Sequence, residues 1–310
     1  MAISWRSKIL LAGIETTYGT DPGPTGADNA VLATEVRLVP MEGNDVSRDL
    51  DLPWMAAQGT IPAELHMRLS YRVELVPSGT AGTAPAWGPL LRACGCAETI
   101  DAGVSVIYNP VSTGHESLTH HLWIGGTRYA MRGCRGTAVL RFNAQGIPYL
   151  EFDFLGLFAV PSEETRATPV LTAFLKPDLV TSARTPVFTL GATSFVMRQA
   201  SLNLGNQVEG RFLVGSESIL IVDRAEQFEC TVEAVPVSTF NPIALANDQT
   251  AQALVLQHGT AAGRIATLDV PAAQMQRVAG LEQAQMITEW PLRLVPLPVT
   301  GNDQWTLTLT

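Results

Sequence analysis

The chain has 310 residues, of which 46% are hydrophobic and 16% charged, so it can bury one large or two medium cores and is not disordered. Its net charge of −9 argues against a protein that binds nucleic acid through phosphate contacts, because such binding needs basic patches. No stretch approaches the roughly 20 apolar residues of a membrane span, so we expect no membrane segment.

The first 33 residues begin with a short apolar stretch and then become rich in turn formers. Ile9–Ile14 is apolar, whereas Tyr18–Gly26 is dense in glycine and proline. This composition favours an extended N-terminal arm or an ordered loop over a helix. An arm without a core of its own often packs on a neighbouring subunit, and a mobile terminus is the alternative.

A long alternating stretch follows. Glu35–Pro40 predicts a short strand and Gly43–Val46 a turn, and the chain is then irregular up to Pro62. Glu64–Leu75 alternates strictly between polar and apolar residues, which is typical of a strand with one solvated and one packed face. The run ends in Val76-Pro77, and since proline donates no ladder hydrogen bond, the strand should stop there or lie at an edge.

The rest of the first half predicts a short helix and several strands. Trp87–Cys94 has apolar residues at helical offsets, and Gly95 can end the helix. The expected strands are Val104–Tyr108, Ser117–Ile124, Thr127–Met131, Thr137–Phe142 and Tyr149–Leu155. Hairpin turns are expected at Gly125-Gly126 and at Asn143–Gly146.

Residues 161–186 are polar and interrupted by prolines, as interdomain linkers often are. We therefore expect a first domain with its N-terminal arm at residues 1–160, a linker at 161–186, and a second domain at 187–310.

The second half repeats the order of the first. Phe195–Leu204 and Ser218–Val222 predict strands, and Arg224–Pro236 alternates as Ala63–Pro77 does and also ends in Val-Pro. Asn241–Gly259 predicts a helix. Its expected cap is Asn247 or Asp248, and its expected apolar stripe is Ala251, Leu254, Val255 and His258.

Further matches support a duplication. Gly205–Val208 is similar in sequence to Gly43–Val46, and Leu292–Leu294 is similar to Leu140–Phe142. Trp305, Leu307 and Leu309 alternate with polar residues in the same way as Leu150, Phe152 and Phe154. The shared order predicts a mainly β protein with two tandem β-sandwich or barrel domains, each with one flanking α-helix.

The cysteines and histidines carry no strong metal signature. Cys94, Cys96, Cys134 and Cys230 are expected to be reduced thiols in a protein that folds in the cytoplasm. On paper, three of these cysteines and one of His115, His120 and His121 make a zinc set. Structural zinc usually uses Cys-x-x-Cys spacing, however, and adjacent residues on a strand point to opposite faces. We expect no metal and no other cofactor.

No catalytic motif is present in the sequence. Gly215–Ser218 lacks the nucleophile elbow of hydrolases, and there is no Walker loop or dinucleotide fingerprint. The acidic pair Glu163-Glu164 lies in the expected linker, where a solvated loop is the simpler interpretation. The sequence therefore predicts no enzyme.

Two stretches carry a family resemblance. Ile14–Pro22, continuing through Thr25–Ala30, resembles the start of the major tail tube proteins of long, flexible-tailed bacteriophages, and so does Ser201–Arg211. The resemblance covers essentially the whole chain, including its doubled layout. It implies a β-sandwich with a flanking helix, in subunits that form stacked rings. A doubled subunit would form a trimeric ring that imitates the six-fold ring of single-domain members.

The resemblance also implies a function and partners. The chain would be a structural protein of the virion tail, assembled in the cytoplasm of the bacterial host, that conducts the genome from capsid to cell. Its partners would be further copies of itself, other tail proteins such as the tape measure, tail terminator and distal tail proteins, and DNA that passes without sequence-specific binding. No individual functional residue carries over.

Open strand edges are templates for the next subunit's sheet, and in a ring they can close around a lumen. The polar faces of the two long strands would then face the lumen, with Glu229 and Glu233 in one and Glu74 and Arg72 in the other. An acidic lumen that lets DNA slide is a hypothesis that the net charge favours and these strands support only in part. The N-terminal arm and the loop Asp101–Glu116 are candidates for contacts between rings.

Two rival functions are weighed against this one. A receptor- or glycan-binding β-sandwich on a virion or cell surface would need exposed aromatic residues in a cleft, whereas Trp54, Trp87 and Trp123 are interpreted mostly as core residues. A hydrolase on a β-rich scaffold would need a nucleophile and a base that the sequence does not display.

Overall fold

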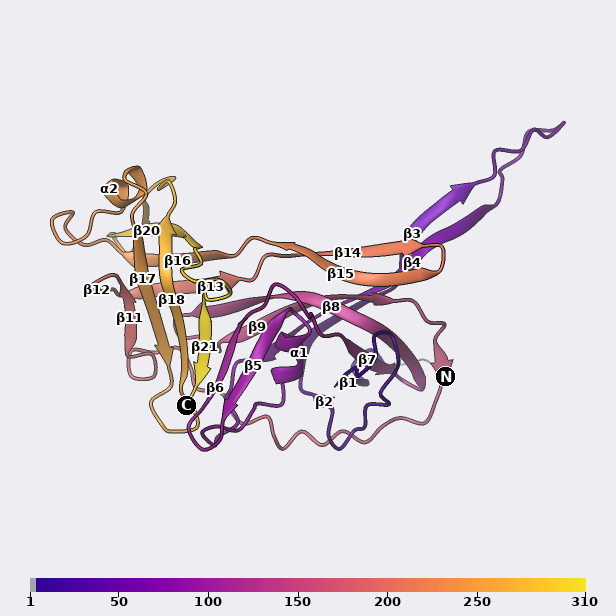
Figure 1. Ribbon diagram of the computed structural model, residues 1–310, viewed down its shortest axis with the longest axis horizontal. Coiled ribbons are helices and arrows are strands. Elements are labelled where there is room, and N and C mark those ends of the chain that lie inside the picture. Colours follow the sequence, from indigo (N-terminus) through magenta and orange to yellow (C-terminus); the bar gives the residue numbers. More distant parts are fainter. Residues whose placement is uncertain (1–3) are drawn as a thin grey trace.

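The computed structural model describes residues 4–310, which form 21 strands and two short helices (Figure 1). The first half contains β1 (Lys8–Ile14), β2 (Ala30–Val31), β3 (Thr34–Ser47), β4 (Thr60–Glu74), α1 (Gly88–Arg92), β5 (Cys96–Asp101), β6 (Ser105–Pro110), β7 (Leu118–Ile124), β8 (Thr127–Asn143), β9 (Tyr149–Leu157) and β10 (Ser162–Glu163). The second half contains β11 (Val187–Leu190), β12 (Thr193–Ser194), β13 (Met197–Asn203), β14 (Asn206–Leu213), β15 (Ser216–Arg224), β16 (Gln227–Glu233), α2 (Pro242–Asn247), β17 (Ala251–His258), β18 (Ala266–Met275), β19 (Glu282–Ala284), β20 (Ile287–Pro296) and β21 (Thr306–Leu309). The predicted mainly β fold is confirmed. Within residues 4–310, neither helix has the length or apolarity to cross a membrane.

The order of paired strands is the same in the two halves. The first half runs β1–β7–β8–β9–β4–β3, and the second runs β11–β17–β18–β20–β16–β13, with every neighbour antiparallel. One short helix follows the strand that ends in Val-Pro in each half, α1 after β4 and α2 after β16. This order is compatible with a duplication. The domain limits stay a prediction, although residues 164–186 contain no helix or strand.

The pairings align the halves differently from the predicted matches. β20 holds the place of β9, beside the Val-Pro strand, and β18 holds the place of β8. The matches of Leu292–Leu294 with Leu140–Phe142, and of the last strand with β9, are therefore wrong. β21 pairs with β18 and reaches across to β6 of the first half. Short alternating runs resemble one another, so local sequence did not distinguish these strands.

Two further predictions of secondary structure are wrong. Gly43–Val46 is no turn but part of β3, where the register shifts between Glu42 and Asn44. A Cβ on Gly43 would lie 2.5 Å from the carbonyl oxygen of Ala63, so the close approach of β4 requires glycine there.

The helix predicted within Asn241–Gly259 is confirmed only for Pro242–Asn247, which is α2. The expected cap, Asn247 or Asp248, lies at the C-terminal end of α2, and the expected apolar stripe from Ala251 to His258 forms the strand β17 instead. Asn241 caps α2 by accepting a hydrogen bond from the Ala244 backbone N–H at 3.0 Å, and Pro242 begins the helix, which ends at Asn247. Leu254, Leu256 and His258 then point into the core with a period of two. β17 accordingly pairs with β11 and β18.

The two halves share one continuous core. Buried apolar side chains from Leu10 to Leu309 form a single cluster, so the repeat is visible in strand order and not in two separate cores. The halves join where β8 pairs with β13, with Leu140 opposite Leu202. They join again where β6 pairs with β21, with Tyr108 opposite Leu307.

The N-terminal segment is an ordered loop that packs on its own chain. β1 pairs with β7, and Glu15 behind it is buried. Tyr18 reaches the second half, where its hydroxyl lies 2.6 Å from the backbone nitrogen of Ile219. Because these contacts are internal, the segment does not project as an arm.

Glu15 is a buried carboxylate with four hydrogen-bond donors around it. It accepts from the hydroxyls of Ser117 and Thr119 at 2.6 Å each, and from the backbone N–H groups of Gly133 at 2.7 Å and Gly19 at 2.8 Å. These bonds tie the N-terminal loop to β7 and β8.

Replacing Glu15 by alanine should lower the free energy of unfolding by about 2–4 kcal/mol, because several buried donors lose their acceptor. Thermal or urea unfolding measures the effect. The matched control is Glu217→Ala, which removes an exposed carboxylate on β15 and should change stability by less than about 0.5 kcal/mol. Equal effects of the two variants would contradict this account.

His120 is a buried histidine without a charged partner. Its Nε2 lies 2.8 Å from the hydroxyl of Tyr71, and its ring contacts Phe154 edge-on. Burial, with a smaller contribution from the neighbouring His121, lowers the pKa of His120 to about 3. The unfolded chain therefore binds a proton near pH 6.5 that the folded chain binds only near pH 3, so stability falls as the pH decreases through this window.

This imbalance predicts a pH dependence that His120→Phe should reduce. Between pH 6.5 and 4.5 the unmodified chain should lose about 2–3 kcal/mol more stability than the variant does, since one pKa unit corresponds to about 1.4 kcal/mol. Urea unfolding at a series of pH values gives both slopes. The lost Tyr71 contact costs the variant the same at every pH in this range, so parallel curves would refute the prediction.

Candidate functional site

The two alternating strands, β4 and β16, belong to one continuous sheet. Successive pairings run β3–β4–β9–β8–β13–β16–β20 and so cross the joint between the halves. One face of this sheet packs on the core through residues such as Leu69 and Phe228. The other face, here called the polar face, carries the alternate residues of these strands, many of them charged.

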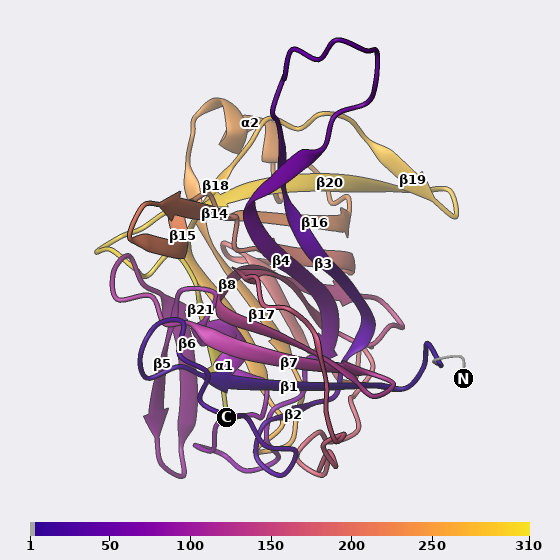
Figure 2. The same cartoon turned by 90° about the vertical axis from the view of Figure 1, so that its right-hand side faces the viewer.

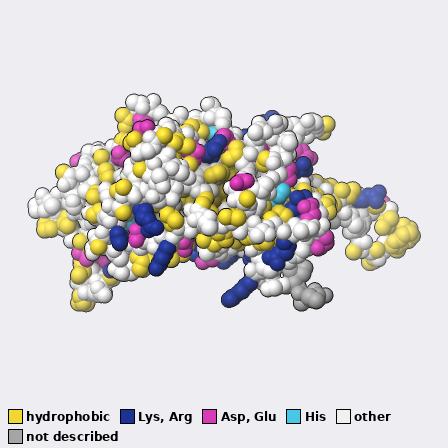
Figure 3. All heavy atoms as spheres, turned by 90° about the horizontal axis from the view of Figure 1, so that it is seen from below, with side chains coloured by type: hydrophobic (Ala, Val, Ile, Leu, Met, Phe, Trp, Pro, Cys, Tyr) yellow, Lys and Arg dark blue, Asp and Glu magenta, His cyan; other side chains and the backbone are white. Residues whose placement is uncertain are grey.

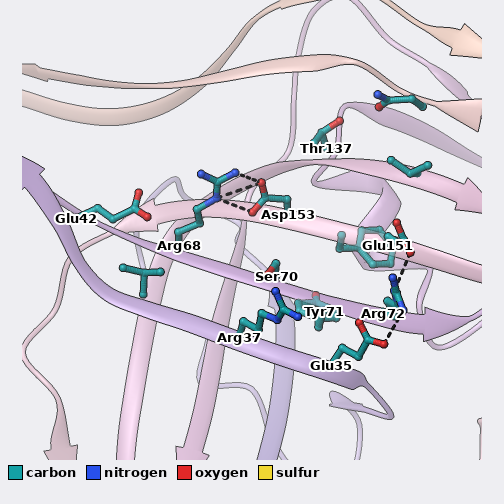
Figure 4. Close-up of a pocket in the computed structure, with 14 residues that line it drawn as sticks. Glu35, Arg37, Glu42, Arg68, Ser70, Tyr71, Arg72, Thr137, Glu151 and Asp153 are labelled. Atoms are coloured by element: carbon teal, nitrogen blue, oxygen red, sulfur yellow. Dashed lines mark hydrogen bonds and ion pairs between the residues drawn. The ribbon is translucent and has the colours of Figure 1, made fainter.

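In the first half the charges of the polar face are locked into ion pairs around a hollow of about 650 Å³ (Figure 4). Arg68 Nε donates to Asp153 Oδ1 at 2.9 Å. Arg72 lies between two carboxylates, 2.6 Å from Glu35 and 2.7 Å from Glu151. Arg68 and Arg72 of β4 are therefore each held by a carboxylate from an adjacent strand.

The polar face continues across the joint. Arg141 of β8 contacts Glu151 at 2.6 Å and also lines a second hollow, of about 230 Å³, with Ser201 and Glu229. Glu229 of β16 forms an ion pair of 3.3 Å with Arg293 of β20. Charged residues of both halves thus share one surface.

The charge of this surface is nearly balanced. The two hollows are lined by six carboxylates, Glu35, Glu42, Glu151, Asp153, Glu229 and Glu282, and by five guanidinium groups, Arg37, Arg68, Arg72, Arg141 and Arg293. Four of the five arginines, all except Arg37, are in ion pairs. The face is a neutral mosaic rather than a strongly acidic one, and paired guanidinium groups offer little free charge to phosphates.

The four residues predicted to face a lumen lie along β4 and β16. Arg72 and Glu229 are in the ion pairs of the polar face. Glu74 ends β4 opposite Tyr149, where burial raises the pKa of its carboxyl group. Glu233 ends β16 opposite Glu289. That these residues face a lumen stays a prediction.

The hairpin of β3 and β4 projects beyond the sheet. The two strands pair as far as Ser47 and Thr60, and the tip between them stands clear of the rest of the chain (Figures 1 and 2). Trp54 is 65% exposed and Met55 is fully exposed. Hydrophobic side chains gather at this end of the molecule in the space-filling view (Figure 3).

The prediction of Trp54 as a core residue is wrong, because its side chain is largely exposed at the tip of the hairpin. Sequence reasoning also missed the tip as a functional surface. The available signal was the apolar run Pro53–Met55 in a segment with no strand or helix periodicity to bury it.

The second half has a corresponding hairpin that folds back onto the first half. β14 and β15 lie over β8 and β9 (Figure 1). The Asn206 amide donates to the carbonyl oxygens of Cys94 at 2.6 Å and Gly136 at 2.9 Å. Ile219 of β15 is itself fully buried, and Phe212 of β14 stacks on His66 of β4 with ring centroids 5.8 Å apart.

The histidines and cysteines point to separate partners. His115 contacts the Val111 carbonyl oxygen, His120 contacts Tyr71, and His121 contacts Asp21. In the part of the chain that the structure describes, no group of three or more His, Cys, Asp or Glu side chains could hold a metal ion. All four cysteines are free and buried, and burial raises the pKa of the Cys96 and Cys230 thiols to about 12.

Comparison with known proteins points to one family. The sequence model described as Phage tail tube protein matches residues 5–302. The match spans both halves, including the projecting hairpin and the joint between β8 and β13. No curated protein matches the chain.

Proposed function

The chain belongs to the phage tail tube protein family, and from this premise we propose that it polymerises as stacked rings into the tube through which the genome leaves the capsid. Its role is structural, and its place is the tail of the virion. We further propose that three subunits form each ring. Every subunit supplies the same strand order twice, so three subunits supply six copies.

One observation carries the proposal: the sheet is unfinished at β3. Within residues 4–310 the outer edge of β3 has no strand partner, and the hairpin beyond it exposes a large apolar tip. An open strand edge is a template for another chain, and an exposed apolar patch marks a protein interaction surface. A second copy of the chain would cover both.

We propose that the polar face lines the channel, with Arg72, Glu74, Glu229 and Glu233 towards the lumen. Four of the five arginines that line its two hollows are held in cross-strand ion pairs, which favours passage of DNA over retention, because strong binding to phosphates needs unpaired cations. The role requires no cofactor and no chemistry.

Further partners are proposed from the family. They are the tape measure protein inside the tube and the tail terminator and distal tail proteins at its ends. Assembly in the host cytoplasm is consistent with four free, buried cysteines.

Electron microscopy of the purified protein tests the proposal. Hollow tubes or rings, with three-fold symmetry in class averages of end views, are the expected result. A monodisperse monomer that binds a glycan would overturn it in favour of the receptor-binding alternative. The exposed Trp54 does not favour that alternative, since it lies on a projecting tip and not in a cleft.

A further inference from the structure

We propose that β3 of one subunit pairs antiparallel with residues 278–282 of the next subunit, as β13 pairs with β8 within the chain. The inference rests on the proposed ring and names the segments that close it. It follows from the repeated strand order together with the joint that the chain already contains.

The internal joint, where β8 pairs with β13, combines a strand pairing with buried apolar side chains at its end. The last five residues of β8, Val139–Asn143, pair with Gln199–Asn203 of β13. Leu202 and Leu204 are buried there, and the Leu204 backbone N–H donates to the Ala138 carbonyl oxygen at 3.0 Å. After Leu204 the chain continues into the hairpin β14–β15, which lies over the first half.

In the first half, β3 holds the position of β13. Both strands open the long hairpin and pair with the strand that ends in Val-Pro: Leu38 lies opposite Leu69 of β4, and Leu202 lies opposite Phe228 of β16. The second edge of β13 is covered by β8, whereas β3 has no second strand within residues 4–310. The corresponding part of β3 is accordingly exposed, with Val39 43% and Met41 51% accessible.

In the second half, the residues after β18 hold the position of the end of β8. Met275 lies opposite Leu294 of β20 as Gly136 lies opposite Phe154 of β9. The same number of residues further along the chain, β8 reaches Val139–Asn143. β18 itself ends at Met275, and the chain there reaches residues 278–282, which run up to the first residue of β19. Residues 278–281 form no strand, and within residues 4–310 no strand holds there the place that β13 holds beside β8.

The vacant position is lined for an apolar occupant. Ile243 and Ala246 of α2, with Val278 and Leu281, line most of a groove of about 480 Å³, and Asn247 and Arg277 are its polar lining residues. If residues 278–282 of one subunit pair with β3 of another, the exposed residues Val39–Met41 would pack in this groove. Leu204 holds the equivalent place in the internal joint, where it is buried.

The charges along the predicted joint are compatible with the pairing. It places Arg37 diagonal to Glu282, so that Arg37, which forms no ion pair with any residue among 4–310, gains a carboxylate. Glu35, which would come opposite Glu282, is already neutralised by Arg72 at 2.6 Å.

Cysteine cross-linking tests the pairing. Val39→Cys and Gly280→Cys place single exposed thiols at diagonal positions on the same face of the two predicted partners, and the four native cysteines are buried. A mixture of the two single variants, treated in the assembled state with a short bismaleimide, should give a covalent dimer. The yield should be at least tenfold higher than for Val39→Cys mixed with Val299→Cys, an exposed control in the turn before β21. The variant with both thiols should give a ladder that ends at the number of chains in the ring.

The outcomes separate this inference from the proposed function. Tubes in the micrographs with cross-linking no higher than in the control would overturn the inference and leave the proposed function standing. Neither rings nor cross-links would remove both. Hydrogen exchange of the unmodified protein needs no variant: the backbone amides of residues 278–282 should gain protection on assembly, and unchanged exchange there would also overturn the inference.

Discussion

Replacing both Trp54 and Met55 by serine is expected to prevent tube formation while leaving the subunit folded. Both side chains are exposed at the tip of the β3–β4 hairpin, so the isolated subunit loses no buried contact. In a tube, burying each would stabilise the assembly by about 1.5–3 kcal/mol. A loss of 1.4 kcal/mol in assembly free energy changes the equilibrium constant tenfold. The protein concentration that the double variant needs for polymerisation should therefore rise at least about tenfold.

Sedimentation across a concentration series measures this change, and electron microscopy identifies the species in the pellet. The matched control is Val160→Ser, which removes an exposed apolar side chain after β9, away from any hairpin tip. Circular dichroism and thermal unfolding of the double variant should match those of the unmodified subunit. If the double variant forms tubes at the same concentration as the unmodified protein, the tip does not stabilise the assembly and the prediction is wrong.

Replacing Trp87 by alanine is expected to cost about 3–5 kcal/mol of unfolding free energy. Trp87 precedes α1 in the core, where it is almost completely buried, and its ring packs against Tyr108 with centroids 5.6 Å apart. Its indole N–H donates to the Val76 carbonyl oxygen at 2.8 Å. The substitution leaves both a cavity and an unpaired carbonyl at the end of the Val-Pro strand.

Thermal unfolding measures this effect, best in the background of the Trp54 and Met55 substitutions, because assembly would raise the apparent stability. Trp54→Ala in the otherwise unmodified chain is the matched control. It removes the same side chain from an exposed position and should change subunit stability by less than about 0.5 kcal/mol. A similar loss in both variants would contradict the assignment of Trp87 to the core and Trp54 to the surface.

If β3 completes the neighbouring sheet, the two hairpins have equivalent roles. β14–β15 lies over the first half of its own chain, and β3–β4 would lie over the second half of the next subunit. The internal contacts, such as Asn206 with the carbonyl oxygens of Cys94 and Gly136, then indicate the kind of bonds expected at the subunit interface. One set of contacts would therefore recur six times around a ring of three chains.

Some elements could be predicted because their signal lies within a few residues. The alternation of Glu64–Leu75 predicted β4, and the offsets from Trp87 predicted α1. The same reasoning gave the wrong result for Ala251–His258, because Leu254, Val255 and His258 also fit the spacing of a helical stripe. The segment is a strand because it pairs with β11 and β18. The β14–β15 hairpin was missed in part for the same reason, because its burial depends on β8 and β9.

By itself, the sequence determined the mainly β character, the alternating strands, the position of α1 after the first Val-Pro and the resemblance to tail tube proteins. These follow from backbone geometry and residue patterns that act over short distances along the chain. Only the tertiary structure decided which strands are neighbours, that Trp54 is exposed, and that the charges of the polar face are paired. These depend on segments up to 200 residues apart meeting in space, as Tyr18 and Ile219 do, and no local pattern encodes such a meeting.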